Sequence, residues 1–347
     1  MKPLDQSLLA GPKLRSAATP PEARGLERDE VRLLVSTGDR HEHAVFHELE
    51  HFLPAGTLLV VNTSATLPAS LPASGRFGSF ILNLSSRYGE QLWLCEPRLS
   101  AAHPGPLPLT AGETFEVAGM SARFVAPYPG LPRLWFVAFD GSVEIAMADE
   151  GEPIRYGYVE PPLPPLSAYQ TIFAERPGSA EMPSAARPFS RRVLEELAWR
   201  NIAIASIELH TGVSSLETTD GGGEPVLYPE PFIVPAATAA AVNSARRDRR
   251  PVIAVGTTVV RALESAWDGY GVRAASGFTR LFVEPQRGVH TIDGLITGFH
   301  DRNATHLAML HAIAGEGRAA EAYDEAMRNE YLWHEFGDSH LILPRIG

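Results

Sequence analysis

Between residues 68 and 150, short apolar or alternating runs are separated by turn residues such as Tyr88-Gly89, Pro129-Gly130 and Asp140-Gly141. Strands at this spacing, without helices between them, predict a small antiparallel barrel or sandwich. The predicted strands are Phe80–Leu84, Gln91–Cys95, Thr114–Val117, Ala122–Val125, Leu134–Phe139 and Val143–Met147.

After the stiff segment Pro161-Pro162-Leu163-Pro164-Pro165, the pattern changes to apolar strands that alternate with amphipathic helices. This alternation is typical of an α/β domain. The predicted strands are Ile202–Leu209, Pro251–Val255, Thr279–Val283, Thr291–Thr297 and Asp338–Leu343, and the predicted helices are Arg191–Arg200, Pro235–Arg247, Thr258–Trp267, Ala304–Ala314 and Arg318–Asn329.

The N-terminal part contributes two further strands to this α/β domain. Val31–Ser36 and Leu58–Val61 are apolar runs too short for helices, with a short helix predicted near Phe46–Phe52 between them. The first 30 residues are rich in Pro, Ala, Arg and Glu and predict an extended arm. The expected architecture is a mixed-sheet α/β domain, residues 1–67 and 151–347, with a small antiparallel β-barrel domain inserted at residues 68–150.

Composition narrows the class of protein. The net charge of -11 argues against a broad nucleic-acid footprint, although a local basic patch remains compatible with it. A single cysteine, Cys95, excludes an internal disulfide and a cysteine-based metal cluster. With no signal peptide and no apolar run long enough for a bilayer, we expect a cytoplasmic protein without a membrane partner.

The segment Val252 to Arg261 reads as a buried strand, a glycine turn and the start of a helix. Gly256 permits a tight turn, and Thr257 and Thr258 are candidates to cap the helix, whose N-terminus favours anions such as phosphate or carboxylate. The alternative is a well-capped turn without a ligand. Arg261 has two candidate carboxylate partners, Asp293 in a strand and Glu264 in a helix, which are otherwise surface charges.

Two histidines follow predicted strands and are candidate acids or bases. His210 lies beside Gly212, and His300 follows Phe299; the alternative for each is a hydrogen-bonded structural histidine. The spacing of His300, His306 and His311 does not fit a zinc site, and we predict no metal. Gly221-Gly222-Gly223 predicts a hinge or lid, and the arginines at 246, 247, 249 and 250 predict a solvated helix end or an RNA-phosphate contact.

Taken together, these segments resemble the S-adenosylmethionine:tRNA ribosyltransferase-isomerase family of queuosine biosynthesis. The order and spacing of the matching segments agree from residue 161 to residue 338. They are the proline segment, Tyr169-Gln170-Thr171-Ile172-Phe173, Pro177-Gly178-Ser179, Leu209-His210 with Gly212, Ile253 to Arg261 with Leu263-Glu264-Ser265, Phe282 with Pro285, Asp293, Leu295-Ile296-Thr297, Phe299-His300, Thr305, Gly315, Tyr331 and Gly337-Asp338.

The resemblance implies an α/β domain that carries an inserted β-barrel, and it also implies a reaction. The ribosyl part of S-adenosylmethionine, the co-substrate, is transferred to the aminomethyl group of a 7-deazaguanine base in tRNA and isomerised to an epoxycyclopentanediol, with release of adenine and methionine. His210 or His300 would be the base or the proton donor. Candidate substrate-binding residues are Gly212, Gly256, Thr257, Thr258, Arg261, Asp293, Phe299 and Tyr169.

The chain departs from the family pattern in segments expected to line the site. Pro188 replaces a histidine, and Ala65 and Ser70 replace two arginines. Ala186 replaces a glycine, and the patterns after His210 and around His300 differ as well. Three functions follow: the family reaction on tRNA, a related S-adenosylmethionine-using transferase or lyase with a small-molecule acceptor, and a non-catalytic binding protein. The tRNA partner and the oligomeric state are open.

Overall fold

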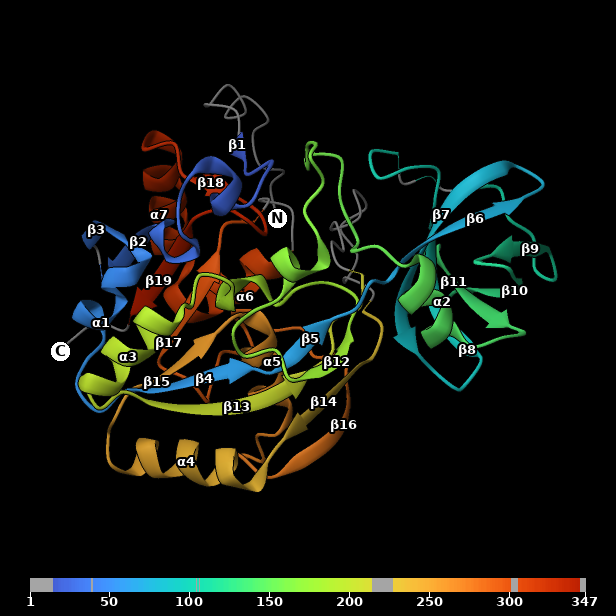
Figure 1. Ribbon diagram of the computed structural model, residues 1–347. Coiled ribbons are helices and arrows are strands. Elements are labelled where there is room, and N and C mark those ends of the chain that lie inside the picture. Colours follow the sequence, from blue (N-terminus) through green and yellow to red (C-terminus); the bar gives the residue numbers. More distant parts are fainter. Residues whose placement is uncertain are drawn as a thin grey trace.

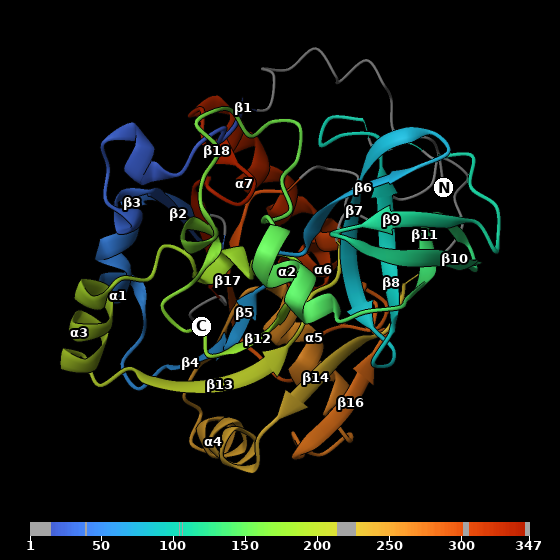
Figure 2. The ribbon, with the colours of Figure 1, turned by 45° about the vertical axis from the view of Figure 1, so that its right-hand side comes forward.

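The computed structural model describes residues 15–38, 40–103, 105, 107–213, 227–300 and 305–343, and Figures 1 and 2 show it from two sides. A large sheet with helices on both faces lies beside a small barrel. The fold predicted from the sequence, a mixed-sheet α/β domain with an inserted antiparallel barrel, is confirmed. The Gly221–Gly223 prediction lies outside the described residues.

A nine-stranded mixed sheet forms the α/β part, in the order β16-β14-β13-β4-β15-β17-β19-β2-β3. Its centre, β13-β4-β15-β17, is parallel. Strand β4 is buried along its whole length because helices cover both faces of the sheet, which explains its continuous apolar run. The strands are β2 Arg32–Thr37, β3 Arg40–Val45, β4 Leu58–Asn62, β13 Ala203–Leu209, β14 Glu230–Val234, β15 Val252–Val255, β16 Ala275–Thr279, β17 Gly294–Gly298 and β19 Ser339–Leu343.

The helices divide into two groups that bury opposite faces of this sheet. Apolar residues of α4 Ala236–Arg247, α5 Thr257–Ser265, α6 Thr305–Ala314 and α7 Glu316–Arg328 share one core. The other face packs on α1 Leu49–Phe52 and α3 Arg191–Trp199, with short 3₁₀ turns at Phe46–Glu48 and Ser184–Ala186. Helix α3 begins where Ser190 accepts a hydrogen bond from the Val193 amide.

The barrel is closed, in the order β10-β11-β8-β7-β6-β9, so it exposes no sheet edge. All its strands lie between Ser70 and Phe139, inside the predicted insert. Strand β6 was not predicted, because Pro and small residues interrupt its apolar pattern. The strands are β6 Ser70–Gly75, β7 Gly78–Arg87, β8 Leu92–Arg98, β9 Thr114–Val117, β10 Met120–Tyr128 and β11 Leu131–Phe139.

The predicted strand at Val143–Met147 is wrong, because the segment is helix α2, Val143–Glu150. Ser142 caps this helix by accepting a hydrogen bond from the Ile145 amide. Its buried residues, Val143, Ala146 and Met147, follow the i, i+3, i+4 spacing of a helix that packs on the barrel core. The cap and this spacing favour a helix over a strand.

The predicted strand at Thr279–Val283 is also misplaced, since β16 ends at Thr279. Beyond it the backbone turns inward: the Leu281 amide donates to the Thr279 hydroxyl, and the Leu281 carbonyl accepts from Arg261. Val283 is buried without belonging to a strand. The apolar run was therefore a sign of burial and not of strand structure.

The predicted extended arm is wrong for residues 15–30, which pack on the α/β part. Strand β1, Arg15–Ser16, pairs in parallel with β18, Leu332–Trp333. Two 3₁₀ turns follow, at Pro21–Arg24 and Arg28–Glu30. Asp29 is buried and accepts hydrogen bonds from Ser190 and Arg192 of the α3 segment. Long-range polar contacts, which local composition does not indicate, hold this segment in place.

A second, two-stranded parallel sheet lies where the chain enters the barrel and where it returns. Strand β5, Ser64–Thr66, leads toward β6, and β12, Arg176–Ser179, follows the return through the proline-rich segment. The two strands pair side by side (Figures 1 and 2). Of the described helices, none is long and apolar enough to cross a membrane.

A buried histidine in the core makes the stability of the fold depend on pH. Burial lowers the pKa of His340 to about 3, with His41 contributing, against an ordinary value of 6.5. The unfolded chain therefore takes up a proton below pH 6.5 that the folded chain refuses, so stability is complete above pH 6.5 and falls toward pH 3. We expect a loss of about 1.5 kcal/mol between pH 6.5 and pH 5 from this group. Urea unfolding at both pH values should show a smaller difference for His340→Gln; an equal difference would contradict the assignment.

Candidate functional site

The carboxyl ends of the parallel strands meet at one edge of the large sheet, where ligands bind in open α/β folds. Asn62 is the last residue of β4, and its side chain connects β4 with strand β13 and helix α5. Its Nδ2 donates to the Leu209 carbonyl at 2.8 Å and to Thr258 Oγ1 at 3.3 Å, and its Oδ1 accepts from the Leu209 amide at 3.1 Å. The ends of β4 and β13 and the start of α5 are therefore held together.

The turn after β15 has the predicted geometry but not the predicted caps. Gly256 has φ +94°, a conformation that disfavours side chains, and it is itself the N-cap of α5. Thr257 and Thr258 lie inside the helix, and no side chain caps it. The expectation that these threonines cap the helix is wrong, because the helix begins one residue earlier than predicted.

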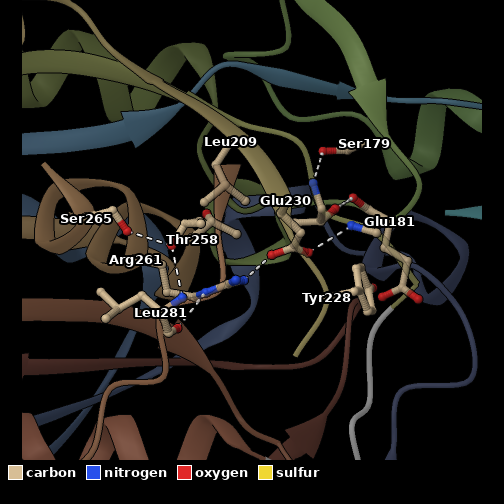
Figure 3. A network of polar contacts seen from close by, with 12 residues as sticks. Ser179, Glu181, Leu209, Tyr228, Glu230, Thr258, Arg261, Ser265 and Leu281 are labelled. Carbon is tan, nitrogen blue, oxygen red and sulfur yellow. Dashed lines mark hydrogen bonds and ion pairs between the residues drawn. The ribbon is translucent and has the colours of Figure 1, made fainter. Parts of the chain in front are cut away.

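A buried carboxylate, Glu230 at the start of β14, connects two of the predicted residues. It accepts from the Gly212 amide at 2.9 Å and pairs with the guanidinium of Arg261, whose Nε also donates to the Leu281 carbonyl (Figure 3). Gly212 has no room for a side chain, since a Cβ there would overlap Ser85 of the barrel and Tyr228. The network thus fixes the backbone after β13 against the barrel.

His300 follows β17 and stacks on His306 of α6, with ring centroids 4.2 Å apart and planes 6° from parallel. Burial, followed by the neighbouring His306 and His334, holds the pKa of His300 well below its ordinary range. Burial and Arg261 lower the pKa of His306 to about 4. Both imidazole rings are therefore neutral at neutral pH, and each has one nitrogen with a lone pair that can accept a proton.

His210 has two polar partners, one at each ring nitrogen. Nδ1 lies 2.7 Å from the Ser64 hydroxyl of β5, and Nε2 lies 2.9 Å from a carboxylate oxygen of Glu208. Burial lowers the pKa of His210, although Glu208 acts in the opposite direction. The strand order separates β13 from β17 by three spacings, roughly 14 Å, so His210 and His300 occupy different parts of the edge.

The chain was compared with known proteins. The family model described as "Queuosine biosynthesis protein" matches residues 10–342. A Thermus thermophilus protein named S-adenosylmethionine:tRNA ribosyltransferase-isomerase is 35% identical over 339 residues, covering 93% of this chain and 97% of the relative. A Deinococcus radiodurans protein of the same name is 33% identical, covering 91% and 89%.

The chain belongs to the queuosine biosynthesis protein family. The resemblance inferred from the sequence is confirmed. The crystal structure of an S-adenosylmethionine tRNA ribosyltransferase from Thermotoga maritima is also similar, with a TM-score of 0.53 and 25% identity over 96% of this chain and 99% of that chain.

Three further predicted residues of this queuosine family protein have different surroundings. Asp293 is exposed before β17, at the opposite edge of the sheet, where it bonds the Val252 amide at 2.9 Å. Tyr169 is buried against Phe336, and burial raises its pKa to about 12. Phe299 is fully buried in an aromatic core.

Neither carboxylate suggested for Arg261 is its partner. Glu264 is buried and accepts from Arg287 and from the backbone amides of His290 and Thr291. Asp293 bonds backbone only, as above, and Glu230 takes the arginine instead. Sequence proximity on α5 suggested Glu264, but its carboxylate is engaged by Arg287, His290 and Thr291.

Two of the departures from the family pattern, Ala65 and Ser70, lie where the chain enters the barrel, and Pro188 lies elsewhere. Ala65 is in β5 and pairs with Pro177, and Ser70 begins β6. Pro188 lines a shallow hollow with Gly298 at the end of β17. The other residues of this hollow are Val31, Ser184, Ala185, Arg187, His334, Glu335, Phe336, Gly337, Asp338 and Ser339.

Several polar residues of the site were missed by sequence reasoning. One had a readable signal: Glu208 lies two residues before His210, so the two side chains share a face of β13. Ser64 and Glu230 had none, since their partners are far away in the sequence, whereas Ser179 belongs to the matching segment Pro177-Gly178-Ser179. In the described part of the chain, no group of three His, Cys, Asp or Glu residues is arranged to hold a metal.

The imidazole of His210 lies directly on the backbone of β12. A Cβ at Gly178 would overlap the ring, with Cε1 only 2.5 Å away. We expect Gly178→Ala to lower the free energy of unfolding by about 1–3 kcal/mol, since the buried ring has to move. Gly277→Ala in β16, where the space is open, is the control and should leave stability nearly unchanged. Chemical denaturation of both variants tests this; equal stabilities would contradict it.

Proposed function

We propose that this chain transfers the ribosyl moiety of S-adenosylmethionine to the 7-aminomethyl-7-deazaguanine base of a tRNA and isomerises it, releasing adenine and methionine. S-adenosylmethionine is the co-substrate, and the reaction takes place in the cytoplasm. The observation that carries this proposal is the match to enzymes of that name along nearly the whole chain. Polar residues at the ends of β4 and β13 and at the start of β14, gathered where the barrel joins the sheet, offer a site for it.

His300 is our candidate for the base because it follows β17 at the carboxyl edge of the sheet, where ligands bind in open α/β folds. The sulfonium of the donor acidifies the adjacent carbon, so removal of a proton gives an ylide. The lowered pKa keeps the ring of His300 neutral, as a base has to be, but it also makes the ring a weaker base. The same low pKa disfavours His300 as the proton donor to the departing adenine.

The turn at Gly256 is the proposed binding site for an anionic group of a substrate. Gly256, Thr257 and Thr258 form the N-terminus of α5, which attracts negative charge. Arg261 follows one turn later, although Glu230 already neutralises it. The methionine carboxylate of the donor and a phosphate of the tRNA are the two candidate anions.

The test is calorimetric titration with S-adenosylmethionine, followed by an assay of adenine release with and without tRNA that carries the aminomethyl base. We expect donor binding and adenine release that requires this tRNA. Adenine release without this tRNA, or with a small amine in its place, would favour a different acceptor. This is the specific alternative, because Pro188, Ala65 and Ser70 replace residues of the family pattern. No donor binding would indicate a repurposed scaffold.

A further inference from the structure

Four side chains form a continuous hydrogen-bonded chain beneath the β5–β12 pair. Ser179 Oγ lies 2.6 Å from Ser64 Oγ, which lies 2.7 Å from His210 Nδ1. Nε2 of the same imidazole lies 2.9 Å from Glu208. Both serines are fully buried, so no solvent competes for these bonds.

The Glu208 end of this chain sets the direction of its protons. An ionised Glu208 can only accept, which requires a proton on Nε2 of His210. A neutral His210 carries one proton, so Nδ1 accepts from Ser64, and Ser64 in turn accepts from Ser179. The Thr211 amide donates to Ser179 Oγ at 3.0 Å, which is compatible with this direction.

We propose that His210 is a positioning residue that holds Glu208, and that Glu208 binds the primary ammonium of the acceptor base. This inference rests on the proposed function. With both ring nitrogens engaged inside the protein, His210 has no lone pair left for the substrate. Its Nε2–H instead fixes one oxygen of Glu208 and leaves the carboxylate charge available.

The surroundings of Glu208 suit a cationic ligand. Its other partner, Arg176 at 3.2 Å, has a side chain that is 72% exposed, so this pair contributes little and is readily displaced. The neighbouring side chains on the same sheet face, Ile204 and Ile233, are exposed, and the side chain of Glu208 is itself 14% exposed. A primary ammonium, with three donors, fits an anchored carboxylate that accepts charge-assisted hydrogen bonds.

Steady-state kinetics of Glu208→Gln tests the ligand. Glutamine can still accept from His210 but has no charge, so we expect the KM for tRNA to rise about tenfold while the KM for S-adenosylmethionine stays the same. Glu195→Gln, which removes an exposed carboxylate of α3, is the matched control and should change neither value. An unchanged KM for tRNA would overturn the proposal, and so would a rise confined to the donor, which would place the sulfonium at Glu208.

Nitrogen NMR of histidine-labelled protein tests the positioning without any turnover. We expect one neutral tautomer of His210, with the proton on Nε2, and a changed Nδ1 resonance in Ser64→Ala together with a higher KM for tRNA. A proton on Nδ1 in the unmodified protein would overturn the positioning role. If the unmodified protein never releases adenine, the proposed function and the ligand of Glu208 both fail, while the NMR result still decides the hydrogen-bond chain.

Discussion

Replacing His300 with glutamine will slow tRNA-dependent adenine release by about 100-fold or more, the size of effect expected when a positioned base is removed. Glutamine keeps a polar side chain of similar reach but cannot take up the proton. His300 is the candidate for this role because it follows β17 at the carboxyl edge of the sheet, and because burial and two neighbouring histidines keep its ring neutral. Single-turnover assays with saturating donor and tRNA measure the chemical step apart from binding.

His51→Gln is the matched control for this substitution. His51 lies in α1, with 58% of its side chain exposed, and α1 precedes the amino end of β4, the edge opposite His300. The control should retain full activity. A His300→Gln enzyme with the same single-turnover rate as this control would remove His300 from the mechanism.

Replacing Glu230 with alanine will lower the free energy of unfolding by about 3–5 kcal/mol, as expected when one partner of a buried ion pair is removed. The substitution leaves the guanidinium of Arg261, only 18% exposed, without its counter-charge. It also leaves the buried Gly212 amide without an acceptor. Urea unfolding followed by circular dichroism measures the loss.

An exposed ion pair provides the comparison. Glu195 pairs with Arg191 on α3 with 59% and 89% of the side chains exposed, and Glu195→Ala should cost less than about 1 kcal/mol. The double variant Glu230→Gln with Arg261→Met should recover most of the stability, because no unpaired charge remains. A Glu230→Ala loss as small as that of Glu195→Ala would contradict the buried-pair interpretation.

Much of the fold could be predicted because local pattern and burial agree. The continuous apolar run at Leu58–Val61 lies in a central strand, and the apolar stripe on Arg191–Trp199 belongs to a helix with one buried face. The errors in the predicted secondary structure come where tertiary contacts, and not the local pattern, determine the conformation of an apolar run. Val143–Met147 packs as a helix on the barrel, and Val283 is buried in an irregular segment.

The site was less predictable, because its residues meet through distant contacts. The sequence singled out His210, Gly212 and Arg261, which do lie in the hydrogen-bond networks at the carboxyl edge of the sheet. Their partners Ser64 and Glu230 are supplied by β5 and β14, whose places in the sheets follow from the whole topology. Asp293 also belongs to a segment that matches the family, but it lies at the opposite edge of the sheet.

The pairing of β5 with β12 also connects the barrel mechanically with His210. The chain passes into the barrel from β5, and β5 is held beside β12. Ser64, on one of its strands, contacts the ring of His210, and Ser179, on the other, contacts Ser64. A ligand that displaces the barrel, and β5 with it, would therefore move Ser64 and change its hydrogen bond to His210.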